Sequence, residues 1–361
     1  MNIKVPIPDK DYRVLVRCET YNQSKYICDA LNGFAIQETD FPFICIVVDD
    51  ASKDGNQEVI RQYANDNCDM SNAYVYDDDI SVYIRVSHKT NTNCVYLFCF
   101  LKVNLYCKQE KQEIYKPYRA VCEFEAICEG DDYWIDPLKL QKQVDFLEEN
   151  EDYVMTHTAF NYLIEYESGV IKDSHSSTDK IINILRNDSE NIIDYILDDN
   201  TYRIQTATVV YRIDTLNEIN KERLIDKEPV FLMGDTPLWV RLCLKGKVHF
   251  FVEETTIYRQ HHGSACHQIN IKDKRRFDLS CSEMRIYFAL KLNNNKLLLS
   301  KFIGEYKNRL LMYKIHDRNY VSNVDIGDAF FYSLSNNRLY LVVYNLYVYL
   351  KQKVVRGLLG R

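Results

Sequence analysis

Blocks of hydrophobic and polar positions alternate along the first 65 residues. A short β-branched run at residues 14–16 ends in polar residues, and apolar side chains then recur at positions 27, 30, 31 and 34, the spacing of an amphipathic helix. A second apolar run at residues 44–48 has no alternation, which is typical of a strand covered on both faces. A polar turn follows, and a further helix is expected at about residues 57–64. This β-α-β-α order predicts a doubly wound α/β sheet.

The middle of the chain is less regular until residue 126, and residues 87–125 carry no assignable pattern. Residues 126–128 form a short apolar strand, after which Asp136 is expected to cap a helix with Pro137 in its first turn. Further elements are expected as strands at 82–86, 153–160 and 206–211 and as helices around Trp239 and from about residue 270 onward. We therefore predict a mostly parallel central sheet flanked by helices in residues 1–265, followed by a mainly helical region in residues 266–361.

Composition narrows the class of protein without identifying a function. The 361 residues are 46% hydrophobic and 27% charged, with 28 Tyr but only 11 Gly and 7 Pro. These values argue against a disordered chain and against a loop-rich all-β fold. The net charge of −7 supplies no general attraction for nucleic acid or anionic lipid, so no nucleic-acid partner is expected.

Cysteine spacing and the N-terminal sequence bear on the cellular compartment. The twelve cysteines are scattered without paired spacing, and we expect them to be reduced core residues. The N-terminus lacks the apolar segment of a signal peptide, and no run approaches the ~18 apolar residues of a spanning helix. A cytoplasmic protein is expected.

Polar or acidic clusters follow three of the predicted strands: Thr20-Tyr21-Asn22, Asp49-Asp50 and Glu129-Gly130-Asp131-Asp132. In an open parallel sheet the ligand crevice lies at the carboxyl ends of the strands. Carboxylates repel phosphate unless a cation such as Mg²⁺ or Mn²⁺ lies between them. Each cluster alone could be a solvated turn. Their occurrence at three matching strand ends predicts a metal-assisted nucleotide site.

Two longer stretches carry a family resemblance. TYNQSKYICDALNGFAIQETDFPFICIVVDDASKDG resembles the opening of family-2 inverting glycosyltransferases of the GT-A fold, and AICEGDDYWIDPLKLQKQVDFLEEN resembles the metal-binding segment of their bacterial branch. Two weaker matches are Met233-Gly234-Asp235 ahead of a Trp-bearing helix, and YRQHHGS at residues 258–264, which is similar to a YRxHxGS element. The resemblance implies a GT-A-like nucleotide-binding domain with a helical C-terminal extension.

The resemblance also assigns roles by position. It implies that Asp50 contacts the base and that Glu129 contacts the ribose. Asp235 stands where the family places its catalytic base. The remaining nucleotide contacts are assigned to Thr20, Tyr21, Asn22, Asp49 and Asp131. The divalent cation, Mn²⁺ or Mg²⁺, is assigned to Asp131 and Asp132 without a choice between them, with His261 as a further candidate ligand.

The implied reaction is transfer of a sugar, with inversion, from a nucleoside diphosphate sugar to a hydroxyl of a saccharide acceptor. A UDP-sugar is the favoured donor. The resemblance extends to bacterial surface polysaccharide synthesis, with a lipid-linked acceptor and peripheral contact at the inner face of the cytoplasmic membrane. The chain departs from the family at Cys45, where an acidic residue is usual, and in residues 87–125, which leaves the donor-sugar contacts open.

Two other functions remain open at this point. A nucleotidyltransferase would share the sheet, the metal and the nucleotide, but it needs a basic phosphate-gripping loop after the first strand. The sequence Glu19-Thr20-Tyr21-Asn22 supplies none. A non-catalytic relative that binds sugar nucleotide stays possible because of the unusual residues 87–125.

Two further motifs suggest a function, but each also has a purely structural interpretation. His261, His262, Cys266 and His267 could suggest zinc, but structural zinc usually takes ligand pairs from two separated segments, and no second pair is apparent. The apolar run Leu339–Leu350 is too short to span a bilayer. It is expected as a buried terminal helix or, alternatively, as an interfacial anchor followed by Lys351 and Lys353.

Overall fold

The structure is a computed structural model. It describes residues 4–106, 108–165, 170–172, 175–187, 189–198, 203–261, 270–292 and 295–314, together with residues 317, 320 and 322. The chain separates into two compact units. The first comprises residues 1–189, 201–222 and 241–261, and the second comprises residues 190–200, 223–240 and 262–361. The sequence placed a single boundary at residue 265, whereas the second unit also includes two earlier segments.

One mixed sheet of eleven strands lies at the centre of the first unit. The strands are β1 Val14–Thr20, β2 Phe43–Asp49, β3 Tyr74–Asp77, β4 Ser81–Ser87, β5 Cys94–Leu101, β6 Phe124–Ile127, β7 Tyr133–Trp134, β8 Tyr153–Ile164, β9 Val170–Lys172, β10 Val210–Arg212 and β11 Lys247–Gln260. Their order is β3-β4-β5-β2-β1-β6-β10-β8-β11-β7, and β9 pairs with β8. The four strands β5, β2, β1 and β6 are parallel to one another. The sequence predicted a mostly parallel sheet and the positions of β1, β2 and β6, but it did not predict β5. The strands β3, β4, β7, β9 and β10 pair antiparallel with their neighbours.

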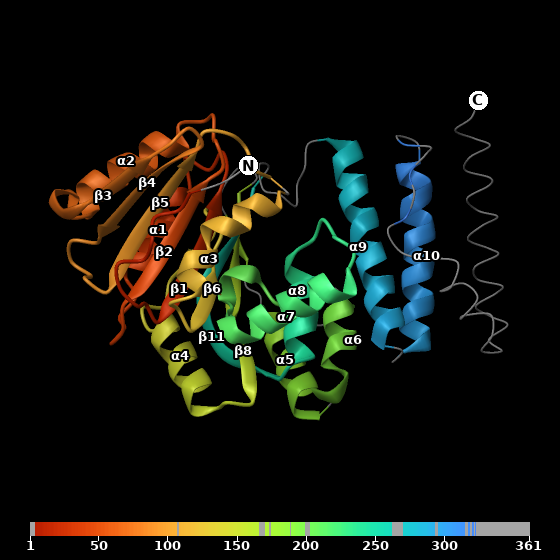
Figure 1. Cartoon of the computed structure of the whole chain (residues 1–361). Coiled ribbons are helices and arrows are strands. Elements are labelled where there is room, and N and C mark those ends of the chain that lie inside the picture. The colour runs from red at the N-terminus through yellow and green to blue at the C-terminus, as the bar shows by residue number, and fades with distance from the viewer. Residues whose placement is uncertain are drawn as a thin grey trace. The chain divides into compact units, whose positions relative to one another are not determined.

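Both faces of the parallel strands are covered, which explains why β2 and β5 are apolar along their whole length. On one face, the even-numbered residues of β1 pack against α1 (Ile27–Ala35), α2 (Asn56–Asn67) and α4 (Lys139–Glu149). On the other face, Leu15, Ile44 and Ile46 pack against Ile114 and Tyr118 from the 3₁₀ helix η2 (Gln109–Ile114) and the short helix α3 (Lys116–Arg119). The helices α1, α2 and α3 can be followed beside these strands in Figure 1.

Several predicted boundaries are corrected. Residues 87–125, which showed no pattern, contain β5, η2, α3 and the start of β6. The strand expected at 206–211 is instead a 3₁₀ helix, η4 (Thr206–Thr208), followed by the short β10. The helix α4 begins at Lys139, because the carboxylate of Asp136 accepts a 2.9 Å hydrogen bond from the backbone N–H of Leu138 and so holds a turn before the helix.

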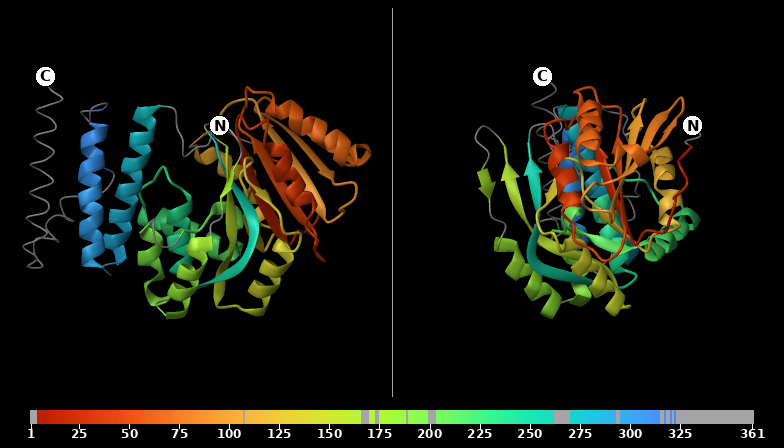
Figure 2. Two further views of the ribbon diagram at one scale, coloured as in Figure 1. Left: turned by 180° about the vertical axis from the view of Figure 1, so that it is seen from behind. Right: turned by 90° about the vertical axis from the view of Figure 1, so that its left-hand side faces the viewer.

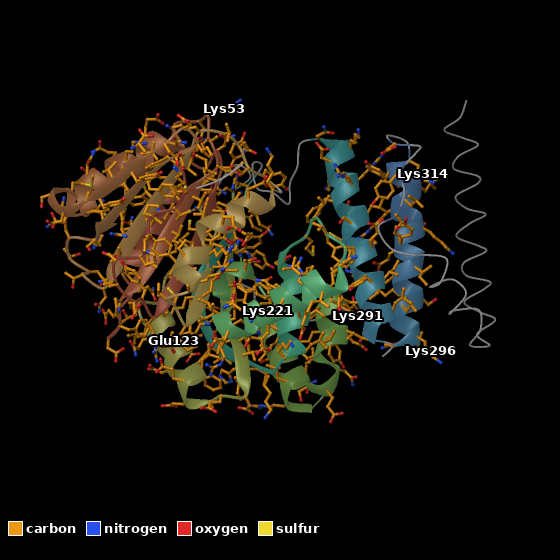
Figure 3. The ribbon with its side chains drawn as sticks, viewed as in Figure 1. Lys53, Glu123, Lys221, Lys291, Lys296 and Lys314 are labelled. Carbon is orange, nitrogen blue, oxygen red and sulfur yellow. The ribbon has the colours of Figure 1, made fainter. Side chains whose placement is uncertain are left out.

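The second unit is helical, as the sequence predicted for the C-terminal region. Two helices, α9 (Ile271–Leu292) and α10 (Lys296–Tyr313), pack against each other and lie side by side in the left view of Figure 2. In Figure 3, Lys291 of α9 is labelled, and its amine is 2.7 Å from a carboxylate oxygen of Glu228.

The remaining described helices of the chain are α5 (His175–Asn187), α6 (Ile192–Leu197), α7 (Ile213–Asp226) and α8 (Asp235–Cys243). No helix in the described part of the chain is long and apolar enough to cross a membrane. The run Leu339–Leu350 and residues 262–267 lie outside the described residues.

Candidate functional site

The three polar clusters meet at the carboxyl edge of the parallel strands. Thr20 at the end of β1 pairs with Asp49 at the end of β2. The backbone N–H of Asp50 donates to the carbonyl of Thr20 at 3.0 Å, and the N–H of Gly130 donates to the carbonyl of Glu19, also at 3.0 Å. The adjacency expected from the strand pattern is therefore present, and it results from the order β2-β1-β6 in the sheet.

Asp49 holds the loop between β2 and α2. Its side chain is fully buried. One carboxylate oxygen accepts from the N–H of Ser52 at 3.0 Å and from Nε2 of Gln57 at 2.7 Å. The other accepts from Nδ2 of Asn56 at 2.8 Å, and the same Asn56 amide donates to Thr20 Oγ1 at 3.0 Å. Both oxygens of Asp49 thus bind protein donors, and its contact with a nucleotide stays a prediction.

The loop after β1 is tied to the loop after β2. The N–H of Asn22 donates to Ser52 Oγ at 2.9 Å, and Asn22 Oδ1 accepts from the N–H of Lys53 at 2.8 Å. Figure 3 labels Lys53 at this edge. Asn22 adopts a positive φ of 53°, which Asn tolerates better than most residues. Between these ties, the ring of Tyr21 is 46% exposed, so it can face a ligand.

Residues of the segment that the sequence could not assign bind both oxygens of the Asp50 carboxylate. Its Oδ1 accepts from the N–H of Leu105 at 2.5 Å, and its Oδ2 is 2.8 Å from the amine of Lys111. The same amine is 3.0 Å from Glu19 Oε2. Sequence reasoning missed Lys111, because nothing in the local pattern distinguishes it from the other lysines between residues 102 and 116.

A buried ion network lies under this edge, on the face covered by α3. Glu125 of β6 is fully buried and accepts from Arg17, from Tyr211 and twice from Arg119, over 2.6–3.2 Å. Burial opposes ionisation, but Arg119 and Arg17 outweigh it and lower the pKa of Glu125. Arg17 also donates to Glu19 Oε1 at 3.1 Å, which links the network to the strand edge. Sequence reasoning missed this network, although a charged residue inside the otherwise apolar strand Phe-Glu-Ala-Ile could have indicated it.

The acidic loop after β6 fits closely against β1. A Cβ added to Gly130 would lie 2.7 Å from Gln23 Oε1 and 2.8 Å from Thr20 Oγ1, so only glycine fits there. Both Asp131 and Asp132 are buried, with residue exposures of 8% and 2%. Burial, together with the charges of Asp131 and Glu129, raises the pKa of Asp132 well above its usual value. A bound cation would relieve this accumulation of negative charge.

The strand β11 supplies the partners of the acidic loop. The N–H of Arg259 donates to Asp132 Oδ1 at 2.8 Å, and its Nη1 donates to the carbonyl of Asp131, also at 2.8 Å. His261 Nε2 lies 3.0 Å from Asp131 Oδ2. Gln205 Nε2 donates to Asp132 Oδ2 at 3.4 Å. The sequence proposed His261 as a candidate ligand but missed the positions of Arg259 and Gln205.

Asp131 and His261 are the donor pair that could bind a divalent cation. Among the described residues, no group of three or more His, Cys, Asp or Glu side chains is arranged to hold a metal ion. Mg²⁺ in nucleotide sites usually takes one or two carboxylates and completes its shell with phosphate oxygens and water. The oxygen of Asp131 and the nitrogen of His261 therefore fit a cation that is bound together with a diphosphate. The choice between Asp131 and Asp132 stays a prediction.

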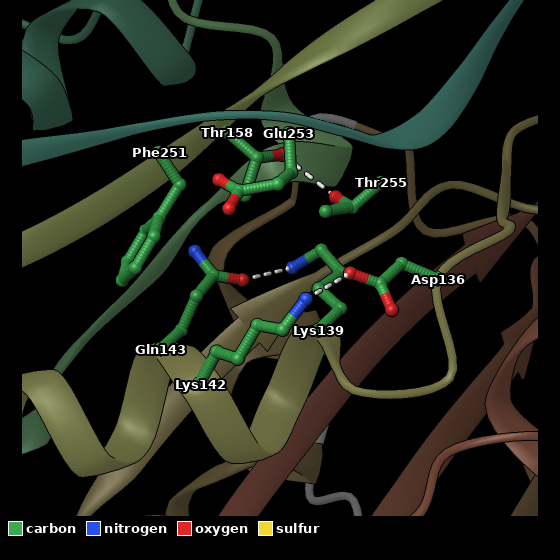
Figure 4. Close-up of a pocket in the computed structure, with 8 residues that line it drawn as sticks. All are labelled: Asp136, Lys139, Lys142, Gln143, Thr158, Phe251, Glu253 and Thr255. Atoms are coloured by element: carbon green, nitrogen blue, oxygen red, sulfur yellow. Dashed lines mark hydrogen bonds and ion pairs between the residues drawn. The ribbon is translucent and has the colours of Figure 1, made fainter.

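A small pocket lies between α4 and the strands β8 and β11 (Figure 4). Its lining residues are Asp136, Lys139, Lys142, Gln143, Thr158, Phe251, Glu253 and Thr255. Lys139 is fully buried and donates to Gln143 Oε1 at 2.6 Å, while its amine lies 4.5 Å from the centre of the Trp134 ring. Burial lowers the pKa of Lys139 to about 7.

We expect Lys139 to make stability rise with pH. In the unfolded chain the amine has its ordinary pKa of 10.5, so between pH 7 and 10.5 the unfolded state binds more protons than the folded state. Relative to the variant Lys139→Met, the free energy of unfolding of the wild type should increase by about 2–3 kcal/mol from pH 7 to pH 9. Urea unfolding at both pH values measures this change. The control Lys142→Met, at a 41% exposed lysine of the same pocket, should leave the slope unaltered; parallel curves for wild type and Lys139→Met would contradict the prediction.

Asp235 begins helix α8 and belongs to the second unit by its residue number. Its Oδ1 accepts a 2.7 Å hydrogen bond from the N–H of Thr236, the next residue of the helix. Its role as catalytic base stays a prediction. Two acids on β11, Glu253 and Glu254, are the alternative candidates for the base. Glu253 is exposed, and Glu254 accepts a 2.5 Å hydrogen bond from Asn161.

Comparisons with known proteins give distant relatives. No family model matches the chain. Over 260 residues it is 31% identical to an uncharacterised protein of Mycobacterium tuberculosis (strain ATCC 25618 / H37Rv) and to one of Mycobacterium bovis (strain ATCC BAA-935 / AF2122/97). These matches cover 72% of this chain, and the chain spans 61% of the length of these relatives.

Solved structures with similar folds include S. aureus TarS 1-349 in complex with UDP-GlcNAc. The identity is 16%, the match covers 84% of this chain and 86% of that chain, and the TM-score is 0.48. Another is the mannosyltransferase PcManGT from Pyrobaculum calidifontis in complex with GDP-Man and Mn²⁺. Here the identity is 12%, the coverage is 99% and 90%, and the TM-score is 0.46. The function is therefore argued from the residues of this chain.

Proposed function

We propose that this protein is a metal-dependent glycosyltransferase of the GT-A type that transfers a sugar from a nucleoside diphosphate sugar to a saccharide hydroxyl. The observation that carries the proposal is the meeting of Thr20–Asn22, Asp49–Asp50 and Glu129–Asp132 at one edge of parallel strands. These are the segments in which the sequence resembles family-2 glycosyltransferases. The nucleotide of a UDP-sugar would lie along this edge, with Tyr21 beside it and Asp50 at the base.

The acidic loop would hold the diphosphate through Mn²⁺ or Mg²⁺. Asp131 or Asp132, together with His261, would be its protein ligands, and the cation would stabilise the charge that develops on the leaving diphosphate. Arg259 keeps the loop in place, because it bonds both the carbonyl of Asp131 and the carboxylate of Asp132. The donor sugar would then extend from the diphosphate toward the acceptor.

For the acceptor step we propose general-base catalysis by Asp235. Its carboxylate would remove the proton of the attacking hydroxyl as the oxygen attacks the anomeric carbon, and the configuration would invert. A lipid-linked saccharide used in bacterial surface polysaccharide synthesis, with peripheral contact at the cytoplasmic membrane, is the proposed setting. The family resemblance supports this part of the proposal.

The first test concerns metal-dependent nucleotide binding. We expect the double variant Asp131→Asn/Asp132→Asn to bind UDP in the presence of Mn²⁺ at least about tenfold more weakly than wild type, which corresponds to about 1.4 kcal/mol. Isothermal titration calorimetry with and without EDTA measures the effect. The matched control Asp145→Asn, at an exposed acid of α4, should bind as wild type does. Equal affinity of wild type and double variant, with and without EDTA, would remove the metal assignment.

A second test separates an enzyme from a sugar-nucleotide-binding relative. Incubation of the protein with a panel of UDP- and GDP-sugars and Mn²⁺ should release nucleoside diphosphate, by slow hydrolysis or by transfer to added saccharides. Tight binding of a sugar nucleotide with no turnover on any acceptor preparation would favour the non-catalytic alternative.

A further inference from the structure

Lys111 joins two carboxylates that come from different strands. Its amine is 3.0 Å from Glu19 Oε2 of β1 and 2.8 Å from Asp50 Oδ2, directly after β2. The lysine is only 7% exposed, and Asp50 is 3% exposed. Because both acids reach the same nitrogen, they lie close enough to repel each other strongly if that charge is removed.

The two acids are themselves fixed to the proposed site. The carbonyl of Glu19 accepts the N–H of Gly130, so Glu19 adjoins the acidic loop. Glu19 Oε1 also accepts from Arg17 at 3.1 Å and from the hydroxyl of Tyr115 at 3.2 Å. These bonds leave Oε2 for Lys111. The ammonium group of Lys111 is therefore anchored to β1, the strand to which the acidic loop is hydrogen-bonded.

Asp50 is held from two sides by residues of one segment. Its Oδ1 accepts from the N–H of Leu105, and its backbone carbonyl accepts from Nδ2 of Asn104 at 2.8 Å. Lys111 binds the remaining oxygen. Leu105 and Lys111 thus determine where both oxygens of this carboxylate point, although the sequence suggested no role for these two residues.

The charges at Lys111 agree with this geometry. Burial opposes protonation, but Glu19 and Asp50 outweigh it and raise the pKa of Lys111, so the amine is charged at neutral pH. Burial likewise opposes ionisation of Glu19, yet Arg17 and Lys111 lower its pKa. One positive charge therefore stands between two negative ones, at the edge where a diphosphate would bring further negative charge.

We propose that Lys111 is a positioning residue for nucleotide binding, which fixes the carboxylate of Asp50 for the base and ties it through Glu19 to β1, the strand to which the acidic loop is hydrogen-bonded. The inference rests on the proposed function, and it gives the unassigned segment a role in that site. Lys111 acts through Asp50 and touches no reacting atom.

The test is a double-mutant cycle on binding of UDP and of GDP with Mn²⁺, measured by calorimetry on the full chain. Lys111→Met should weaken binding of the preferred nucleotide about tenfold or more. Lys111→Arg, which keeps the charge, should restore most of the affinity. In an Asp50→Asn background, Lys111→Met should add little, because the two residues act as one unit.

Two controls separate this role from a general loss of folding. Lys116→Met removes an exposed lysine of the same segment, paired only with exposed Glu113, and should bind as wild type does. The double variant Asp50→Asn/Lys111→Met retains a balanced charge, so it should fold even where Lys111→Met alone does not. Wild-type affinity in Lys111→Met, or full additivity with Asp50→Asn, overturns the inference while leaving the proposed function intact. Failure of the unmodified protein to bind either nucleotide overturns both.

Discussion

Replacing Asp235 with asparagine should lower the rate of sugar transfer by about 10²–10⁴-fold, the usual contribution of general-base assistance. Asparagine has nearly the same shape, and it can still accept the hydrogen bond that Thr236 donates. The variant should therefore fold normally. A base acts on the acceptor hydroxyl and not on the nucleotide, so donor affinity should remain that of the wild type.

The measurement is initial velocity at saturating donor, together with nucleotide affinity by calorimetry. Glu253→Gln and Glu254→Gln serve as comparisons, since both are acids on β11. If Asp235→Asn retains near-normal transfer and one of the other variants loses it, the base is on β11. A fall in donor affinity along with the rate would instead indicate a role in binding.

Replacing Glu125 with alanine should lower the free energy of unfolding by about 3–5 kcal/mol, because a buried charge partner is removed and two largely buried arginines are left without it. Arg17 and Arg119 have side chains that are 20% and 13% exposed. Since the pKa of Glu125 is lowered in the folded state, its contribution is present above the ordinary pKa of 4.5 and is lost as the pH falls through the lower folded value.

A matched control lies two residues away. Glu123, labelled in Figure 3, pairs with Arg13 at the surface and is 59% exposed. Glu123→Ala should cost at most about 1 kcal/mol, as surface ion pairs do. Urea unfolding at pH 7 and at pH 4, followed by tryptophan fluorescence, compares the two variants. Equal destabilisation at pH 7 would show that burial of the Glu125 network adds nothing to its strength.

Much of the site could be anticipated because its segments follow apolar strands. The candidate site residues stand at or directly after the ends of the apolar runs that form β1, β2 and β6. Parallel strands bring such residues to one edge of the sheet. The weaker YRxHxGS match also pointed to His261, which lies against Asp131. The partners of these residues were harder to find. Lys111 and Gln205 have side chains of common types in segments with no distinctive periodicity, and the YRxHxGS match includes Arg259 but gave it no role.

The sequence by itself determined the α/β class, the positions of the parallel strands β1, β2 and β6 and the polar and acidic clusters at their ends, because apolar periodicity and turn chemistry are local properties. It could not determine which basic side chain lies beside which acidic side chain. Lys111 and Glu19 are 92 positions apart, and Arg259 and Asp131 are 128 apart. Such pairs depend on the order of strands in the sheet and on how residues 102–119 and β11 fold back against it. Only the tertiary structure decides this, because a buried charge is stable next to whichever opposite charge the packing brings within reach.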